Sequence, residues 1–548
     1  MARLLCSKPR VAITAGTILG LAATSVWLSA RLSDTRAVSE LMPPGALLYL
    51  EAKDFHGLLN DWNNSTVKPR WLRSANHAVL AESRLIQRLS QAQGEFAEVT
   101  GIPIGMGFAD QTAGTRSGFA FYNLSALRFV YLSQIPESHM DNMRLWRDRA
   151  KYTRREVSNI PFYVKGNDDA TRTVAFASYN AWFVVATDEN LAAETLILLS
   201  GRKDASIATE GWFQAANKEA SAPGDLRLVY NLTALVATPQ FRTYWLQRNV
   251  TELKPFSAGI SDLFRQDDGW KEERAMLRKG EATVGSPDES LNDVLGYAPN
   301  SSSLYRAWSM PDRDRLTDAL QTLIAPEQPQ APVFQPPAPE VTTEAGDIGN
   351  EADLETRIDE PPFQHVSKLS AAPLIDAIIA MQPTAMLQVQ TTRELRDQVF
   401  IMPASGVVIA CKRADRTALD TALAQVRGPL GPGLVDTLNV SVNGNILVLS
   451  RLNLTRGANT TAIMPSNARY IAVYNHAGEW PHYKKLFGIL DRTPSGAEGP
   501  LTPNGPPFFS GNLESIGDSL PRLQKASIVS SDTGAAIHEI VKYEFARP

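Results

Sequence analysis

Apolar and polar positions along the chain follow patterns typical of strands that lead into helices. Thr173 to Tyr179 and Trp182 to Thr187 are β-rich runs separated by only two residues, which predicts a hairpin. Thr187 and Asp188 are good N-cap types before the apolar run LAAETLILL, and Gly201 is a typical helix stop. We therefore predict a hairpin followed by a helix in this region.

The C-terminal half contains similar units. Leu438 to Val442 and Asn445 to Ser450 flank Asn443-Gly444, a favoured pair for a type I′ turn. The chain closes with Ala526 to Ser530 and an alternating run from Ile537 to Phe545, which predicts a final hairpin.

Two other strands lead directly into helices, one in each half. Arg128 to Ser133 precedes a helix opened by Pro136, and Gly406 to Cys411 precedes a helix from Asp415 to Val426. Gly428 is expected to end the second helix. Both halves of the chain thus use the same parts.

A proline followed by a short strand containing Leu-Tyr, and then by a helix, occurs more than once. Pro44 precedes Leu48 to Ala52, and Pro299 precedes Leu304 to Ala307. Pro465 before a strand at Tyr470 is a third, degenerate case. The recurrence predicts an internal repeat in which Tyr49 and Tyr305 are equivalent. The helix after the second strand should bury Leu316, Leu320 and Leu323 on one face.

These patterns predict an α+β protein with two related halves, each containing antiparallel sheets and amphipathic helices, preceded by one transmembrane helix. The expected parts are a cytoplasmic tip and anchor at 1–36, one half at 37–290 and a second half at 291–548. A proline- and acid-rich linker at 326–362 interrupts the second half, and Arg492 to Pro507 forms a shorter loop.

The N-terminal hydrophobic segment decides the predicted location. Val11 to Ala30 is 20 residues without a charge, which as a helix spans about 30 Å, the thickness of a hydrocarbon core. Arg3, Lys8 and Arg10 stand before it, so the positive-inside rule places the N-terminus in the cytoplasm. The bulk of the chain is then periplasmic or otherwise extracytoplasmic.

A cleaved signal peptide is the alternative interpretation of this segment. Ser29-Ala30 has the general form of a cleavage site, and cleavage there would give a secreted protein. Leu28 at the −3 position and Arg31 directly after the cut fit that interpretation less well, which favours an uncleaved anchor.

The stretches PPGALLYLEAKD, TVAFASYNAWFVVATDENLAAETL and DLRLVYNLTAL resemble uncharacterised bacterial envelope proteins of the domain-of-unknown-function type. Those proteins carry one N-terminal membrane segment and a large extracytoplasmic part. The resemblance implies an envelope location and a mixed α+β architecture. It implies no catalytic residue.

The charge balance argues against a polyanionic partner such as nucleic acid or an anionic membrane surface. The sequence has 54 basic and 58 acidic residues, a net charge of −4, and the first 30 residues hold bases but no acid. We find no basic stripe interleaved with aromatic residues, so we expect no nucleic-acid binding.

Sequence motifs for metals and cofactors are missing. The chain has no Gly-Lys dipeptide and hence no phosphate-binding loop of the Walker type, and it has neither HExxH nor CxxC. The best local metal candidate is His476, Glu479 and His482, but Gly478 and Pro481 predict a solvated loop there. We therefore expect neither a metal nor a cofactor.

Nucleophilic motifs are equally weak. Ser65 and Lys68 satisfy S-x-x-K without the companion motifs of penicillin-recognising enzymes, so we interpret them as a chance match at a helix end. Cys411 lies in an apolar run and is expected to be a small buried hydrophobe. The charged runs at 271–274 and 312–315 are interpreted as exposed helix faces.

The sequence therefore predicts a membrane-anchored envelope protein that acts as a binding or scaffolding element and not as an enzyme, with no catalytic residue assigned. Its expected partners are the membrane through residues 11–30 and an envelope protein or an apolar ligand. One alternative is an envelope hydrolase acting on peptidoglycan, an ester or a glycan through other carboxylates or Ser65. Another is a carrier of apolar ligands.

Overall fold

The computed structural model describes most of the chain between Arg36 and Ala546. The described residues are 36–74, 77, 84–103, 105–167, 172–202, 205–238, 253–282, 290–299, 302, 304–324, 371–395, 398–430, 438–457, 467–490, 517, 520 and 522–546. The predicted anchor at 11–30, the linker at 326–362 and the loop at 492–507 lie outside them. Within these ranges no helix has both the length and the apolarity needed to cross a membrane.

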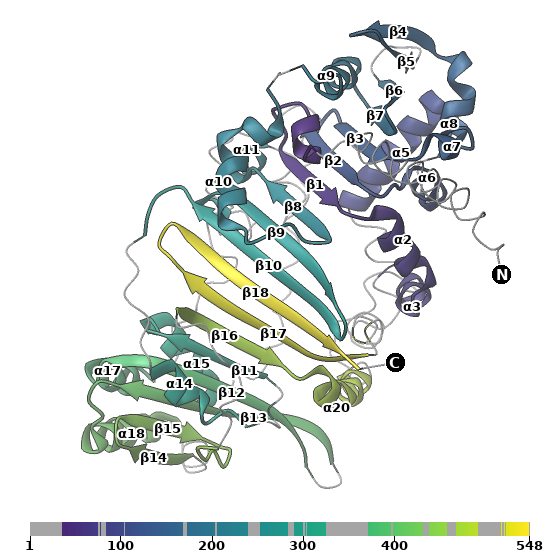
Figure 1. Cartoon of the computed structure of the whole chain (residues 1–548). Coiled ribbons are helices and arrows are strands. Elements are labelled where there is room, and N and C mark those ends of the chain that lie inside the picture. Colours follow the sequence, from purple (N-terminus) through teal and green to yellow (C-terminus); the bar gives the residue numbers. More distant parts are fainter. Residues whose placement is uncertain are drawn as a thin grey trace, which may run out of the picture. The chain divides into compact units, whose positions relative to one another are not determined.

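The chain divides into two compact units. Unit 1 comprises residues 1–51 and 95–210, and unit 2 comprises residues 52–94 and 211–548. The described residues contain 18 strands together with helices, and every pair of strands with a resolved register is antiparallel (Figure 1). The prediction of an α+β fold with antiparallel sheets is confirmed.

In unit 1 the strands pair in the order β1-β2-β3-β7-β6-β5-β4. Their bounds are β1 Leu48–Ala52, β2 Ser117–Asn123, β3 Arg128–Gln134, β4 Thr153–Val157, β5 Ile160–Gly166, β6 Thr173–Tyr179 and β7 Trp182–Ala186. The helices are η1 Val38–Leu41, α6 Met106–Thr112, α7 Glu137–Met140, α8 Arg144–Arg147, η2 Asp148–Lys151, α9 Glu189–Leu199 and η3 Ile207–Thr209, and α5 Arg84–Thr100 crosses the unit boundary in sequence.

The hairpin-to-helix prediction in unit 1 is confirmed. Asn180 and Ala181 both have positive φ angles, as a tight two-residue turn between β6 and β7 requires. The Asp188 carboxylate then accepts hydrogen bonds from the backbone N–H groups of Asn190 and Leu191 and caps α9. Gly201 has a φ of +85° directly after the helix, which ends it.

In unit 2 the strands pair in the order β8-β9-β10-β18-β17-β16-β11-β12-β13-β15-β14. Their bounds are β8 Leu226–Tyr230, β9 Phe256–Gln266, β10 Gly269–Arg278, β11 Leu304–Ser309, β12 Pro383–Leu395, β13 Gln398–Cys411, β14 Asn439–Asn443, β15 Ile446–Ser450, β16 Ala468–Tyr474, β17 Leu523–Asp532 and β18 Ala536–Phe545. The helices are α2 Phe55–Asn64, α3 Val67–Arg73, α10 Gly211–Glu219, α11 Leu232–Val236, α14 Ser290–Leu295, α15 Arg313–Ile324, α17 Ala372–Ala380, α18 Arg416–Leu430 and α20 His476–Leu490.

Helices cover both faces of the sheet around β13. Val407, Ile409 and Cys411 pack into one apolar cluster with α15, α17 and α18, whereas Val408 and Ala410 pack into a second cluster with α14. The predicted apolar face of α15 is confirmed, because its three leucines at 316, 320 and 323 are fully buried in the first cluster. Burial of the apolar side chains of these two clusters away from water is the main source of stability in this part of unit 2.

The middle of the unit 2 sheet is much more open. β10 pairs with β9 on one side and with β18 on the other, and β18 pairs with β17 (Figure 1). Nearly all side chains of β10 are only partly buried. The run at 271–274, predicted as an exposed helix face, lies in β10, so that prediction was wrong. Lys271 and Glu273 point to one face and Glu272 and Arg274 to the other, and each pair is joined by an ion pair.

Two series of strands are connected in the same order. β1-β2-β3-β7-β6 corresponds in its pairing to β11-β12-β13-β15-β14, and β8-β9-β10 corresponds to β16-β17-β18. Tyr49 and Tyr305 are each the second residue of the first strand in their series, β1 and β11. The Tyr49 side chain is fully buried, whereas Tyr305 is partly buried against the cluster around Val408.

Two boundary predictions in unit 2 were wrong by a few residues. Asn443 pairs with Ile446, so the turn between β14 and β15 consists of Gly444 and Asn445 and not of Asn443 and Gly444. Helix α18 continues through Gly428 to Leu430. A glycine inside a helix costs only about 1 kcal/mol, which neighbouring contacts can outweigh.

Candidate functional site

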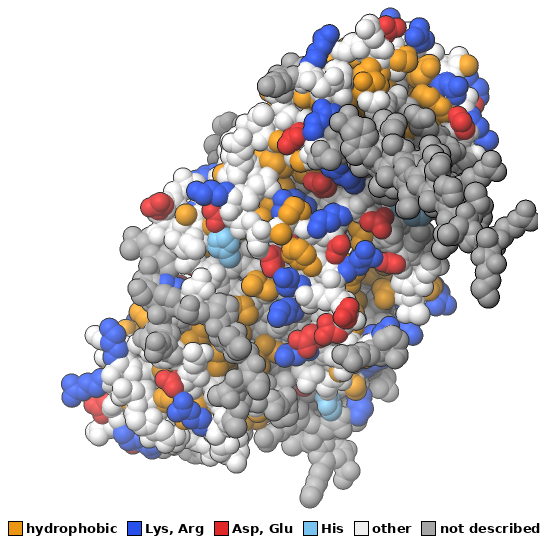
Figure 2. Space-filling view, viewed as in Figure 1, with side chains coloured by type: hydrophobic (Ala, Val, Ile, Leu, Met, Phe, Trp, Pro, Cys, Tyr) orange, Lys and Arg blue, Asp and Glu red, His pale blue; other side chains and the backbone are white. Residues whose placement is uncertain are grey.

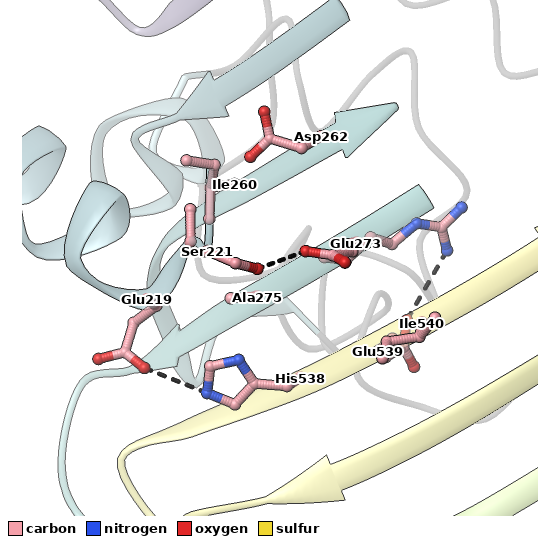
Figure 3. Close-up of a pocket in the computed structure, with 11 residues that line it drawn as sticks. Glu219, Ser221, Ile260, Asp262, Glu273, Ala275, His538, Glu539 and Ile540 are labelled. Atoms are coloured by element: carbon pink, nitrogen blue, oxygen red, sulfur yellow. Dashed lines mark hydrogen bonds and ion pairs between the residues drawn. The ribbon is translucent and has the colours of Figure 1, made fainter. Parts of the chain in front are cut away.

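A polar pocket of about 150 Å³ lies on one face of β9, β10 and β18 in unit 2 (Figure 3). It is lined by Glu219, Ala220, Ser221, Ile260, Asp262, Glu273, Arg274, Ala275, His538, Glu539 and Ile540. The strand registers explain why residues so distant in sequence meet. Ala275 pairs with Ile260 in β9 and with His538 in β18, and directly paired residues share a face of the sheet.

Helix α10 packs over this face and supplies the opposite wall. Glu219 is its last residue, and its carboxylate lies 3.1 Å from His538 Nε2. Ser221 follows the helix, and its hydroxyl donates a short hydrogen bond of 2.5 Å to the Glu273 carboxylate. Figure 3 shows these two contacts side by side, with the small Ala275 between them. Two carboxylates therefore face the cavity from opposite walls.

The charge of Glu273 is stabilised by its neighbours. Partial burial raises the pKa of its carboxyl, but hydrogen bonds from Lys271 and Ser221 and the charge of Lys271 outweigh burial, so the pKa is lowered overall. The Lys271 ammonium lies 2.7 Å from the other carboxylate oxygen. Glu273 is thus an ionised hydrogen-bond acceptor at neutral pH.

Asp262, which also lines the pocket, has a structural role. Both of its oxygens accept hydrogen bonds from the Arg227 guanidinium at 2.8 Å, and one of them also accepts from the backbone N–H of Gly224 at 2.7 Å. Both side chains are buried, and Arg227 further donates to Asn217 in α10. The pair fixes α10 and its following loop to the sheet and so positions Glu219 and Ser221.

A second ionic cluster occupies the other face of the same strands. Arg274 makes a bidentate contact with Glu272 at 2.6 and 2.7 Å and lies 3.7 Å from Glu539 in β18. Ser261 in β9 also donates to Glu272. The hydrogen bond to Glu272 raises the pKa of Arg274 further above its ordinary value. This cluster ties β9, β10 and β18 together beneath the pocket.

The arrangement favours binding over nucleophilic catalysis. The Ser221 hydroxyl donates to a carboxylate whose pKa is lowered, and a weak base of this kind is poorly matched to removing a proton at neutral pH. The described residues include no cluster of three or more His, Cys, Asp or Glu side chains suited to a metal ion. What the pocket offers is two hydrogen-bonded carboxylates, one hydroxyl and one imidazole above an apolar floor.

Ser65 and Lys68 do not form a catalytic pair. Ser65 is the C-cap of α2, and its hydroxyl donates to the Trp62 carbonyl and accepts from the backbone N–H of Lys68. The Lys68 amine instead lies 2.6 Å from the side-chain oxygen of Asn63. Both side chains serve the junction between α2 and α3, so the hydrolase alternative receives no support from Ser65.

The segment predicted as a solvated loop around His476 is helical, so that prediction was wrong. α20 begins at His476 and contains Pro481, and both His476 and Glu479 are buried. The imidazole of His476 stacks on Trp480 at 5.4 Å, and this packing stabilises the first turn despite the proline. The packing of α20 therefore accounts for the burial of His476 and Glu479.

Cys411 is buried at the end of β13, and burial raises the pKa of its thiol to about 12. A thiol in this state is not a nucleophile at neutral pH. Its position in the apolar cluster agrees with the interpretation as a small hydrophobe.

Sequence reasoning did not find the pocket, because its members are brought together only by strand register. Glu219 and His538 are far apart in the chain, and neither belongs to a local motif. The one available signal was the polar residue His538 directly after the apolar stretch Ala535 to Ile537 at the start of the last strand. Such a residue marks a partly open sheet face only once the neighbouring strand is known.

Comparison with known proteins identifies no family for this chain. No family model and no curated protein matches it. Among solved structures, crystal form I of TP0453 matches with 13% identity over 46% of this chain and 82% of that one, at a TM-score of 0.23. Crystal form III of TP0453 matches with 11% identity over 47% of this chain and 84% of that one, at a TM-score of 0.24. The resemblance to domain-of-unknown-function envelope proteins stays a prediction.

Proposed function

We propose that this chain is an extracytoplasmic binding protein, held at the membrane by residues 11–30, which takes a small amine-bearing ligand in the polar pocket of unit 2. The observation that carries the proposal is the convergence of Glu219, Ser221, Glu273 and His538 on one cavity. A few convergent polar groups above an apolar floor are the usual composition of a small-molecule site.

Charge and size define the ligand class. Glu273 is compensated by Lys271 and Asp262 by Arg227, whereas Glu219 faces only the imidazole of His538 among the contacts described around the pocket. A ligand ammonium can donate hydrogen bonds to Glu219 and supply the positive charge. The volume of about 150 Å³ is below the roughly 300–1,000 Å³ of sites for drug-sized molecules, so the ligand is small.

The two alternative functions fit the pocket less well. A carrier of apolar ligands requires a long apolar cavity, and this one is lined by polar side chains that include Glu219, Asp262 and Glu273. A hydrolase using two carboxylates requires one with a raised pKa to act as the acid, and the pKa of Glu273 is lowered. The lining of the pocket therefore supports the binding function better than either alternative.

A ligand titration of the full-length chain in detergent micelles tests the pocket. Ethanolamine and glucosamine serve as amine probes, with ethylene glycol and glucose as their uncharged counterparts, and calorimetry measures the affinity. We expect the amines to bind and the uncharged probes to bind at least tenfold more weakly, since charge-assisted hydrogen bonds are about twice as strong as neutral ones.

Paired variants locate the binding. Glu219→Gln combined with Glu273→Gln should weaken amine binding by roughly 10- to 100-fold, because it removes the two carboxylates that make the hydrogen-bonded contacts with His538 and Ser221 across the cavity. Glu544→Gln is the matched control, since Glu544 lies on β18 at partial burial outside the pocket. Equal affinity in the double variant and the wild type would refute the pocket as the ligand site.

The anchor and the repeat are two further parts of the proposal. If residues 11–30 anchor the chain, the mature protein keeps its N-terminus and fractionates with membranes, and N-terminal sequencing starting near Arg31 would contradict this.

We further infer that the two series of strands are duplicated copies that meet at β10 and β18. This inference is supported by their equal pairing order and by the positions of Tyr49 and Tyr305.

Separate expression of the two halves tests whether they are joined through β10 and β18. Residues 37–290 and 291–548, produced as two chains, should associate through the nine residue pairs between β10 and β18. Gel filtration of the mixture measures association. Gly269→Pro is a suitable disrupting variant, because the backbone of Gly269 lies directly against Tyr543 in β18. Two folded chains that do not associate would contradict the inferred joint.

A further inference from the structure

Unit 1 carries a dense group of basic side chains around the strand β4. Residues 144–157 contain six basic and two acidic residues, although the whole chain is acidic. We call these six residues the basic rim: Arg144, Arg147, Arg149, Lys151, Arg154 and Arg155. In Figure 2 blue side chains gather at the end of unit 1 where Figure 1 places α8 and β4.

The fold turns these side chains outward. β4 pairs only with β5 among the described strands, and four of its five residues are exposed. Because side chains of a strand alternate, Arg154 and Arg155 project to opposite sides of this edge. α8 and η2 precede the strand and add Arg144, Arg147 and Lys151, all exposed. Arg149 lies over the Trp146 ring at 5.0 Å and completes the rim.

The acids near the rim do not neutralise it. Asp148 lies 3.0 Å from Lys151, Glu156 lies 3.4 Å from Arg154, and Glu189 at the start of α9 lies 3.4 Å from Arg155. Three acids thus face six bases. Ion pairs between exposed side chains are weak, so phosphate groups in a partner can replace these carboxylates at little cost.

The length of the chain between the predicted anchor and Arg36 allows the rim to reach the membrane. Arg36, the first described residue, donates hydrogen bonds to the carbonyls of Leu198 and Leu199 at the end of α9. Six residue steps separate it from Ala30, so Arg36 lies within about 20 Å of the end of the predicted anchor. The 11 residues of α9 span about 16 Å, and Glu189 at the other end of α9 contacts Arg155. We call the segment between Ala30 and Arg36 the tether. It is long enough for the basic rim to touch the bilayer surface.

We propose that the basic rim docks unit 1 onto the headgroups of anionic phospholipids in the membrane that holds the chain. This inference rests on the proposed anchor at residues 11–30. A lipid surface fits better than a small anion because the six bases are spread over a helix, a turn and both sides of a strand. A flat array of phosphates can satisfy them together, and the short tether raises the local concentration of that surface.

Hydrogen exchange of the full chain in lipid nanodiscs tests the docking. One preparation contains phosphatidylcholine alone and the other about 30% phosphatidylglycerol, which supplies the negative surface charge. Amides of residues 144–157 should exchange readily without lipid, since β4 pairs only with β5 among the strands that the structure describes. We expect their exchange to slow by roughly tenfold in the anionic nanodiscs and to recover in about 0.5 M NaCl, which screens the charges.

Matched variants identify the residues responsible. Arg147→Gln, Lys151→Gln and Arg154→Gln together should abolish the protection, because each base contributes roughly fivefold in affinity for an anionic surface. Arg313→Gln, Arg416→Gln and Arg456→Gln together are the control: these are exposed arginines of unit 2 that likewise contact aspartates. This control should leave the protection unchanged.

Each outcome decides one part of the proposal. Equal exchange in neutral and anionic nanodiscs, or loss of protection in the control variant, overturns docking by the rim. Equal protection by the same concentration of free inorganic phosphate overturns the lipid surface as the partner. Comigration with neutral nanodiscs in gel filtration reports on the anchor separately. If the chain comigrates with nanodiscs but gains no protection from anionic lipid, the anchor is supported and docking by the basic rim is overturned.

Discussion

Two strands of unit 2, β13 and β10, are paired in the same antiparallel way but have opposite surroundings. From Ser405 to Cys411 every residue of β13 is buried, because helices cover both faces of the sheet. In β10 only Ala275 is buried, and charged side chains occupy both faces. Figure 2 shows acidic and basic side chains interleaved over this open part of the sheet.

The comparison shows that the sheet is held by two different kinds of interaction. Burial of apolar area stabilises the strands around β13, where close packing leaves little space for a ligand. Backbone pairing holds β9, β10 and β18 side by side. Ion pairs of Arg274 with Glu539 and of Arg278 with Asp532 join β10 to β18 and β17, and one buried ion pair joins β8 to β9. The pocket lies on the second region because polar side chains remain accessible there.

The largest expected effect concerns the buried ion pair between Arg227 and Asp262, which lies in the open region of the sheet around β10. Asp262→Ala leaves the Arg227 guanidinium buried without its carboxylate and should lower the free energy of unfolding by about 3–5 kcal/mol. Urea denaturation measures the loss. This loss in the free energy of unfolding should match or exceed the loss caused by a cavity in the helix-covered region around β13.

A double variant separates the charge effect from packing. Replacing Arg227 by Met and Asp262 by Leu removes both charges at similar volume and should recover most of the stability. Amine binding should still fall, because Arg227 also holds α10 through Asn217 and so positions Glu219. A double variant as unstable as Asp262→Ala would show that the pair acts by shape and not by charge.

Truncating matched aliphatic residues compares the two regions directly. Leu320→Ala opens a cavity in the cluster beside β13, where the side chain is fully buried, and should cost about 2–5 kcal/mol. Ile540→Ala on the half-buried face of β18 should cost about 1 kcal/mol, since less area leaves water. Equal losses in urea denaturation would remove the distinction between the regions.

The same contrast explains what could be predicted from sequence. Hairpins with strong turn residues and helices with one apolar face follow local rules. The hairpin that begins with β6 at Thr173 and the helix α15 that begins at Arg313 are predicted by those rules. β10 was misread because its four consecutive charged residues at 271–274 carry no apolar period. Its strand conformation is imposed by pairing with β9 and β18, which is a non-local effect.

The candidate sites were harder to foresee for the same reason. Glu219, Glu273 and His538 meet through the registers of three strands and the position of one helix. The basic rim lies in the run Arg144 to Arg155, which contains Trp146 and Tyr152, so the statement that the chain has no basic stripe interleaved with aromatic residues was wrong for this segment. The acidic average of the chain concealed the run. Local charge runs on predicted surface segments are therefore more informative than net charge.

Acid should affect the open region first. Hydrogen bonds from Arg278 lower the pKa of Asp532 in the folded protein. The pair therefore stabilises the fold above the ordinary aspartate pKa near 4, and this contribution disappears as pH falls through the lowered folded value. Asp532→Asn should cost about 1 kcal/mol at neutral pH and flatten the loss of stability below about pH 4. Denaturant titrations at several pH values measure both effects, and an unchanged pH slope would assign the acid sensitivity to other carboxylates.

The smallest expected effect separates two ion pairs of nearly equal length. Arg313 and Asp376 lie 2.7 Å apart on exposed helix surfaces in the helix-covered region, with side chains 56% and 60% exposed. Arg274 and Glu272 lie 2.6 Å apart in the open sheet, with side chains 37% and 17% exposed. Water and salt screen the first pair more strongly, so double-mutant cycles to Gln and Asn should give a coupling below about 0.5 kcal/mol for it and about 1 kcal/mol for the second. Raising the salt concentration should weaken the first coupling proportionally more than the second. Equal couplings would mean that the charges on β10 are as well solvated as those on a helix surface, and the open region would then be held by backbone pairing and its one buried ion pair.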